Sequence, residues 1–452
     1  MGPGGSGHSN VCRSKAVAMS DYIFMLESHL STEQSRAVEE VQAAAAPANV
    51  NVFLTGGAMR DMLAGFRIRD LDFVIEGNAL KVAKAVVERT GAKVVSLDET
   101  RKSMELLLAS GVTMQIAMSR QEKYTRTGAK PQVTSATIQE DLRGRDFTCN
   151  AIALSLNRAS KGLLLDPMNG LADIQRRELR LTSPYGFYDD PSRLLRLIRF
   201  RMRLGFAVEE RTQMQVANAR ESEVEKLIPA RALGDELKHI AVEDNPAEIL
   251  RALGEAGLLS LISPVLTGPK LNLPGLAKFE KIARMVPDEP RFRSARRGPC
   301  LYALTEKLTP KEEQALIKAT ELRKPEVDLW QKLEGRAKKL ETALRSARIH
   351  KASQVYFLVA KALPDEILFL LYHSALKPVQ DRLRNYFQKY VPAVLEITPE
   401  EWAAVAAKAG AKAGKAREEF IANRLDRRVR KPAPPPLPPP PVVEAVNLRR
   451  GR

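Results

Sequence analysis

Residues 52–77 of this 452-residue chain read VFLTGGAMRDMLAGFRIRDLDFVIEG, with Asp70 and Asp72 just before an apolar run at residues 73–75. Apolar and β-branched residues around an alternating acidic pair predict a short strand. Side chains alternate faces along a strand, so both carboxylates are expected on one face. Two such carboxylates repel each other unless a cation or a proton lies between them, and Mg²⁺ prefers oxygen ligands. The segment therefore predicts a magnesium site, with a solvated strand face as the alternative.

Two glycines, Gly56 and Gly57, lie between a strand expected at residues 52–54 and a helix expected at residues 58–64. Glycine lets the backbone approach a phosphate, and the start of a helix offers free N–H groups. A tight turn is the alternative for the glycine pair taken alone. Together with Arg60 and the carboxylates, the pair favours a site for a triphosphate and a metal. Such a site suits nucleotidyl transfer, in which a hydroxyl attacks and pyrophosphate leaves.

The composition limits the classes of partner and chemistry. The formal net charge of +17 and the isoelectric point of about 9.7 indicate a polyanionic partner, without separating RNA from DNA or an anionic membrane. The three cysteines lie far apart, which fits a reducing cytoplasm and no disulfide framework. The five histidines are scattered, so a zinc site has no support. The sequence contains neither an apolar run long enough to span a membrane nor a Walker-type phosphate-binding motif.

Residue patterning divides the chain into five segments. Short strands and helices alternate up to residue 182, with further strands expected at residues 93–96, 105–109 and 112–118. Helical periodicity replaces this alternation from residue 189 onward, where no convincing strand is found. The expected segments are an N-terminal extension, partly disordered, in which one helix can form (1–44), an α+β catalytic-type domain (45–182), two helical domains (183–265 and 266–428) and a disordered Pro/Arg-rich tail (429–452).

A basic helix is predicted in the stretch DDPSRLLRLIRF at residues 189–200. Asp190 is a suitable N-cap and Pro191 a suitable first helical residue. At about 100° per residue, four arginines share about a third of the helix circumference, opposite an apolar face. They are Arg193, Arg196, Arg199 and Arg203. The apolar face would be buried and the other would present guanidinium groups, with a solvated basic stripe as the alternative.

The stretch TGGAMRDMLAGFRIRDLDFVIEG (55–77) resembles the first motif of the class II tRNA nucleotidyltransferase and bacterial poly(A) polymerase family. Four further stretches resemble that family's remaining motifs, in order. They are EDL (140–142) with RDFTCNA (145–151), Asp166-Pro167 with Gly170 and Asp173, DDPSRLLRLIRF (189–200), and IPAR (228–231) leading to DEL (235–237). The resemblance covers roughly residues 45–265, and five motifs in the family's order are highly specific.

This resemblance implies an α+β fold class: an N-terminal nucleotidyltransferase domain with a mixed sheet, like that of DNA polymerase beta, followed by all-α nucleotide-recognition and RNA-binding domains. It implies that Asp70 and Asp72 are catalytic and hold Mg²⁺. The nucleotide-binding residues that it implies are Gly56, Gly57, Arg60, Arg145, Asp146, Asp190, Arg193, Arg196 and Arg199. Asp190 and Arg193 would read the Watson–Crick edge of CTP or ATP, because a carboxylate beside a fork of donors matches those edges.

Two positions depart from the family's pattern. Gly144 stands where the family usually has the first arginine of an Arg-Arg-Asp run, and Gln115 where it tends to have an acidic residue. Glutamine cannot act as a charged ligand, so weaker metal binding and slower turnover are expected. Residues 120–139 show no clear periodicity and resemble the family's flexible loop, which is associated with the switch from C to A addition. That loop argues against an enzyme adding only CC.

The sequence therefore predicts a cytoplasmic tRNA nucleotidyltransferase that adds or repairs the 3′-terminal CCA of tRNA, using CTP, ATP and Mg²⁺. The basic helices at residues 311–424 would contact the RNA backbone, with no membrane association and a monomeric or dimeric state. The closest alternatives are an enzyme that adds only the final A and a poly(A) polymerase. An alternative from another class is a catalytically weak RNA- or nucleotide-binding protein.

Overall fold

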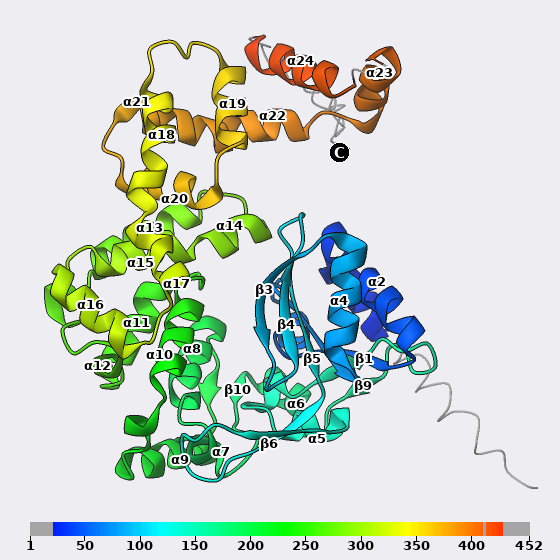
Figure 1. The fold of residues 1–452 in the computed structure, drawn as a ribbon, viewed down its shortest axis with the longest axis vertical. Coiled ribbons are helices and arrows are strands. Elements are labelled where there is room, and N and C mark those ends of the chain that lie inside the picture. Colours follow the sequence, from blue (N-terminus) through cyan, green and yellow to red (C-terminus); the bar gives the residue numbers. More distant parts are fainter. Residues whose placement is uncertain (1–20, 410–412, 428–452) are drawn as a thin grey trace, which may run out of the picture. The chain divides into compact units, whose positions relative to one another are not determined.

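The computed structural model describes residues 21–409 and 413–427, and its N-terminal part is built on a seven-stranded mixed sheet (Figure 1). The strand order is β3-β4-β5-β2-β1-β8-β9, in which β2 and β5 run parallel and the other neighbours antiparallel. The strands are β1 (Asn51–Thr55), β2 (Leu71–Glu76), β3 (Lys93–Asp98), β4 (Ser103–Leu107), β5 (Thr113–Met118), β8 (Ala153–Ser155) and β9 (Leu164–Leu165). The mixed sheet expected from the sequence is thus confirmed.

Two helices, α2 (Thr32–Ala45) and α4 (Ala79–Thr90), pack against each other beside the sheet (Figure 1). The Asn78 side chain caps α4 by accepting from the Lys81 amide, and Gly91 ends the helix in a left-handed conformation. A short helix at residues 21–29 precedes α2.

The face of the sheet away from α2 and α4 carries the acidic side chain of Asp72 in β2. Phe53 and Val74, paired across β1 and β2, pack there with Ile138 and Leu142 of α5 (Ile138–Arg143). Asp72 lies two residues before Val74 and therefore shares this face. The sheet thus has an apolar core at one end of this face and the carboxylates at the other.

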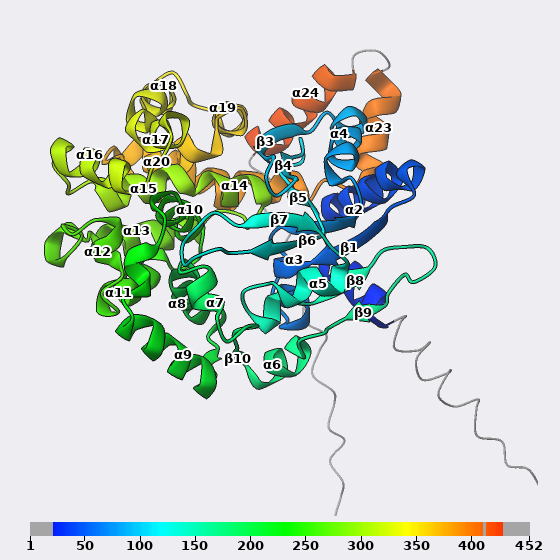
Figure 2. The ribbon, with the colours of Figure 1, turned by 60° about the horizontal axis from the view of Figure 1, so that its bottom comes forward.

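Residues 120–139, expected as a loop without periodicity, contain two short strands on either side of an irregular segment. β6 (Arg120–Lys123) and β7 (Gln132–Ser135) pair as an antiparallel hairpin that extends from the sheet (Figure 2). The strands are only four residues long and mainly polar, which explains why no alternation of apolar residues revealed them.

The helical region contains one strand that the sequence did not predict. β11 (Ala207–Val208) pairs in parallel with β10 (Glu178–Leu179). Two residues are too few to produce a period-2 pattern, so propensity alone could not identify this pair.

Helices joined by loops make up the rest of the described chain, among them the short 3₁₀ helices η1 (Ala46–Ala48) and η4 (Gly268–Lys270). Near the sheet these are α3 (Gly56–Leu63), η2 (Thr148–Asn150), α6 (Gly170–Arg176), α7 (Gly186–Asp189), α8 (Arg193–Leu204), α9 (Glu210–Glu221), η3 (Val224–Leu227), α10 (Ala230–Ile240), α11 (Pro246–Glu255) and α12 (Leu259–Ile262). Further along are α13 (Leu273–Ala283), α14 (Pro290–Ala295), α15 (Arg297–Thr305), α16 (Pro310–Ala319), α17 (Lys324–Gln331), α18 (Leu333–Arg345), α19 (Ala352–Ala360), α20 (Pro364–His373), α21 (Lys377–Asn385), the π-helix η5 (Tyr386–Tyr390), α22 (Val391–Leu395), α23 (Pro399–Ala409) and α24 (Ala413–Asp426). Within the described ranges, none of these helices combines the length and apolar character needed to cross a bilayer.

The chain divides into two compact units. Of the described residues, one unit comprises those at 21–345 and 362–380, and the other those at 346–361, 381–409 and 413–427. The domain boundaries expected from the sequence stay predictions. The expected disordered start, as far as residue 20, and the Pro/Arg-rich tail at residues 429–452 lie outside the described residues.

Candidate active site

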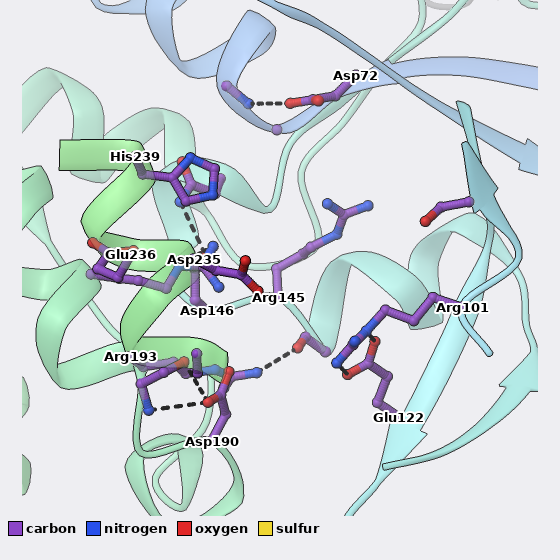
Figure 3. Close-up of a pocket in the computed structure, with 18 of the residues that line it drawn as sticks. Asp72, Arg101, Glu122, Arg145, Asp146, Asp190, Arg193, Asp235, Glu236 and His239 are labelled. Carbon is purple, nitrogen blue, oxygen red and sulfur yellow. Dashed lines mark hydrogen bonds and ion pairs between the residues drawn. The ribbon is translucent and has the colours of Figure 1, made fainter. Parts of the chain in front are cut away.

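A cavity of about 820 Å³ lies in the first unit, between the acidic face of the sheet, the β6–β7 hairpin and the helices α8 and α10. Every site residue predicted from the sequence lines it. In Figure 3, Asp72 lies on one side of this space and Asp190 on the other, and the side chain of Arg145 extends between them.

The wall formed by β2 carries two closely spaced carboxylates. Asp70 is exposed just before β2 and accepts a hydrogen bond from Thr113 Oγ1 at 2.5 Å. Asp72 is less exposed and accepts a hydrogen bond from the Gly57 amide at 3.2 Å. Burial, followed by the negative charge of Asp70, raises the pKa of Asp72 to about 6. Arg145 and Arg60 offset this rise only in part, so a cation beside the pair would favour the ionised form of Asp72.

The glycine turn brings the start of α3 against this wall. Gly56 has a φ of +63°, and a Cβ atom there would lie 3.0 Å from Asp72 Oδ2. A side chain at this position would thus be strained and would crowd the carboxylate. Thr55 precedes α3 without capping it through its side chain. No side chain caps the first turn of α3, and of its N–H groups the Gly57 amide already donates to Asp72.

Arg60 lines the cavity but is only 2% exposed, because its side chain is held by protein groups. Its Nε and Nη2 donate to Asp61 Oδ1 at 2.9 and 2.8 Å, and its Nη1 donates to Asn150 Oδ1 at 2.7 Å. Burial disfavours the charged guanidinium, but the charge and hydrogen bond of Asp61, together with Cys149 and Glu243, outweigh it and raise the pKa of Arg60. Arg60 thus orients the glycine turn through α3. Sequence reasoning missed Asp61 and Asn150, although Asp61 directly follows Arg60.

Arg145 and Asp146 occupy the middle of the cavity. Arg145 Nε donates to Asp141 Oδ1 at 2.7 Å. Asp146 Oδ2 pairs with Arg196 of α8 at 2.6 Å, and its Oδ1 accepts from Asn150 at 3.0 Å. Burial opposes ionisation of Asp146, but the charges of Arg196 and Arg193, together with hydrogen bonds from Asn150 and the Phe147 amide, lower the pKa of that carboxyl. These contacts join the sheet domain to α8.

The start of α8 differs from the prediction that Asp190 is its N-cap. The helix begins at Arg193, and Asp190 instead ends α7 and accepts from the amide and the hydroxyl of Ser192 at 3.1 and 2.6 Å. Residues 190–194 form turns that are tighter than an α-helix. The Arg193 and Leu194 amides donate to the carbonyl groups three residues earlier, those of Asp190 and Pro191. The Asp-Pro signal thus marks a turn that precedes the helix.

The arginines of α8 are paired with protein groups, so the alternative of a solvated basic stripe is wrong. Arg193 donates to the Gly144 carbonyl at 3.1 Å. Arg199 donates to Glu236 at 2.6 Å and to Glu243 at 3.1 Å, and Arg203 donates to Asp61 at 2.6 Å. Because Arg193 contacts the backbone of Gly144, this contact is independent of the side chain that the family usually has there.

Two walls of the cavity hold residues that the sequence did not identify as site residues, although Arg231 and Asp235 lie in the stretch that resembles the family's fifth motif. The hairpin supplies Glu122, whose carboxylate accepts from Arg101, Arg120 and Tyr124 at 2.9, 2.8 and 2.8 Å. Helix α10 supplies a line of polar residues at intervals of four: Arg231, Asp235 and His239 (Figure 3 labels the last two). Their spacing along one helix face was a signal that could have identified them.

Residues 52–180 match the family described as the poly A polymerase head domain. The sheet domain is therefore similar to that head domain.

Known relatives of the head domain carry two different names. An A-adding tRNA nucleotidyltransferase of Aquifex aeolicus is 37% identical over 201 residues, covering 44% of this chain and 24% of that protein. A multifunctional CCA protein of Alkalilimnicola ehrlichii is 36% identical over 231 residues, covering 48% of this chain and 51% of that protein. The matches thus span from a quarter to about half of the length of these relatives.

The likeness in fold extends beyond the head domain. A solved structure of a CCA-adding enzyme in an apo form matches with a TM-score of 0.50 and 25% identity, covering 90% of this chain and 95% of that one. The helical region after the head domain therefore also resembles that of a CCA-adding enzyme.

Proposed function

We propose that this protein is a tRNA nucleotidyltransferase that adds or repairs the 3′-terminal CCA of tRNA with CTP and ATP. The observation that carries the proposal is the placement of Asp70 and Asp72 on one wall of a single cavity and of Asp190 and Arg193 on another. A nucleotide that spans the cavity would meet the carboxylates with its triphosphate and the second pair with its base. The names of the relatives agree with this proposal.

The carboxylate pair fits Mg²⁺. No group of three or more His, Cys, Asp or Glu residues suited to a metal is found among the described residues, so protein ligands would be few. Mg²⁺ commonly binds through one or two carboxylates and completes its shell with water and substrate phosphates. When bound by Asp70 and Asp72, it would activate the terminal 3′-hydroxyl of the RNA and stabilise the leaving pyrophosphate.

The remaining residues would bind and orient the nucleotide. The glycine turn at Gly56 and Gly57 would hold the triphosphate at the start of α3, with the Gly57 amide shared with Asp72. Arg60 would act on it through the turn, since its donors are occupied by Asp61 and Asn150. Arg145 and Asp146 would contact the sugar and phosphate, and Asp190 with Arg193 would read the base edge. Arg196 and Arg199 would support this wall from α8, through Asp146 and Glu236.

The RNA would be bound chiefly through its backbone. A net charge of +17 favours a polyanion, and duplex RNA arms are recognised by shape and phosphate contacts. The tRNA acceptor arm is the partner proposed for the helices that follow the head domain, in the cytoplasm and with the protein as a monomer or a dimer.

A second candidate is an enzyme that adds only the final A, because several relatives are named A-adding tRNA nucleotidyltransferases. One experiment separates the candidates: tRNAs ending before CC and at CC are incubated with CTP, ATP and Mg²⁺, and the products are sequenced. Completion of both tRNAs to CCA supports the proposal. Addition of A only to the tRNA ending at CC supports the second candidate, and a long A ladder indicates a poly(A) polymerase. Binding of tRNA without any extension would indicate a non-catalytic binding protein.

A further inference from the structure

Glu243 lies just after α10 and joins two walls of the cavity, although it does not itself line the cavity. Its carboxylate is 4% exposed and contacts three arginines. Oε2 accepts from Arg69 at 2.5 Å and lies 3.7 Å from Arg203 Nε, and Oε1 accepts from Arg199 at 3.1 Å. A single buried carboxylate thus holds three cations together.

The three arginines come from opposite sides of the cavity. Arg69 directly precedes Asp70, the first of the two carboxylates at β2. Arg199 and Arg203 lie on α8, the helix that begins with Arg193. A shift of Glu243 would therefore move the β2 carboxylates relative to the residues proposed to read the base.

The three arginines around Glu243 depend on its carboxylate as a shared counter-charge. Without its carboxylate, Arg203 would keep Asp61 as its counter-charge at 2.6 Å and Arg69 would keep Asp244 at 2.5 Å. The arginines would then repel each other in a site with little access to water, because like charges at short range disfavour the charged forms. We expect β2 and α8 to move apart, because this separation would reduce the repulsion between the arginines.

We infer that Glu243 is a positioning residue that fixes the β2 carboxylates against the α8 wall, in the geometry required for nucleotidyl transfer. Glu243 touches neither the nucleotide nor the metal in this arrangement, and acts through Arg69 and the two arginines of α8. The inference rests on the proposed function for its catalytic readout, and its structural readout is independent of that function.

The catalytic test uses Glu243→Gln, which removes the charge and keeps the shape. The kcat of tRNA extension at saturating nucleotide should fall at least ~10-fold, because displacement of reacting groups by about 1 Å can cost ~100-fold. The Kd for ATP without RNA should stay within about 3-fold, since the nucleotide contacts themselves remain. The matched control is Asp244→Asn, which removes the neighbouring partner of Arg69 and should leave kcat within about 3-fold.

The structural test measures the distance between nitroxide labels on the two sides. The labels are placed at Val95→Cys on β3 and Met214→Cys on α9, which are 46% and 56% exposed, in a Cys12→Ser background. The distance distribution should broaden in Glu243→Gln and match the wild type in Asp244→Asn. If Glu243→Gln does not fold, Arg69→Lys serves instead, because an ammonium cannot bond both Glu243 and Asp244 as the guanidinium fork does.

The outcomes separate this inference from the proposed function. A wild-type protein that extends no tRNA would refute the proposed function, and the distance measurement would then decide the inference alone. A lower melting temperature for Glu243→Gln, with kcat and distance distribution equal to those of Asp244→Asn, would overturn the inference and leave Glu243 with a role in stability only.

Discussion

Gln115 lies directly beside Asp72 in the sheet, because β2 and β5 run parallel in a register that pairs the two residues. The Gln115 side chain is exposed and lines the cavity. The next residue in the same row is Glu105 of β4, which accepts a hydrogen bond from Ser96 at 3.0 Å. Neighbouring strands are about 4.8 Å apart, so Glu105 lies about twice that distance from the β2 backbone. Position 115 is therefore the place where a third carboxylate could join the pair.

We expect Gln115→Glu to lower the Mg²⁺ concentration needed for half-maximal extension by up to ~10-fold, because it adds negative charge beside Asp70 and Asp72. A titration of extension rate against Mg²⁺ measures this. Glu105→Gln is the control and should leave the Mg²⁺ requirement unchanged. An unchanged requirement in Gln115→Glu would show that this position does not contribute to the metal site.

Asp70→Asn and Asp72→Asn should each abolish tRNA extension, with a loss of at least ~1,000-fold, because each removes an anionic oxygen ligand and keeps the side-chain size. The tRNA Kd should remain within about 3-fold, since on the proposed function phosphate contacts of the helical region would carry most of the binding. Extension kinetics and filter binding provide the two measurements. Extension by both variants at wild-type rates would remove these residues from the metal site.

Local signals in the sequence predicted part of the fold around the site, but they could not predict which residues pair over long distances in the sequence. The strand β2 and the Asn78 cap of α4 follow from residue alternation and capping chemistry within a few positions. The partners of the α8 arginines do not follow from any pattern within a few positions. Asp61 is 142 residues from Arg203, and Glu243 is 44 residues from Arg199. Helical periodicity placed the arginines on one face correctly, but which carboxylates meet that face depends on how the domains pack.

Gly56→Ala should abolish most extension activity and also lower stability. Its φ of +63° costs an L-residue about 1–2 kcal/mol, and the added methyl would lie 3.0 Å from Asp72 Oδ2. Gly65→Ala is a matched control, since Gly65 has a φ of +74° with no atom within 4 Å of the added methyl. Urea unfolding should show a similar loss for both variants, and extension assays a loss for Gly56→Ala only. Equal activity in the two variants would show that the glycine turn does not need to approach Asp72.

Arg193→Ala should reduce discrimination against UTP without changing the Mg²⁺ requirement. Arg193 is 8% exposed, donates to the Gly144 carbonyl and has an Nε without a partner in the described structure. Loss of a donor that reads a base edge commonly costs about 1–3 kcal/mol of discrimination, or ~10–100-fold. Competition between CTP and UTP on one tRNA measures this ratio. Arg193→Lys keeps the charge but lacks the fork of donors, so it should lose selectivity as well.

The stability of the protein should depend on pH through Glu243. Burial would raise the pKa of Glu243, but the charges of Arg203, Arg199 and Arg69 prevail and hold it at about 2, against 4.5 for an ordinary glutamate. Because the folded-state pKa is depressed, the ionised group stabilises the fold above about pH 4.5, and this contribution is lost as the pH falls toward 2. At 1.36 kcal/mol per pKa unit, the contribution at pH 7 is ~3 kcal/mol.

Glu243→Gln should therefore lower the free energy of unfolding by ~3 kcal/mol at pH 7, and by about half as much or less near pH 3. Urea unfolding at pH 7, 5 and 3 measures the difference from the wild type. Glu39→Gln on the exposed side of α2 is the control and should change the free energy of unfolding by less than about 0.5 kcal/mol at each pH. Asp61 and Asp244 keep their charges in Glu243→Gln and partly compensate Arg203 and Arg69. A difference that stays constant from pH 7 to pH 3 would mean that side-chain packing, and not the charge of Glu243, stabilises this junction.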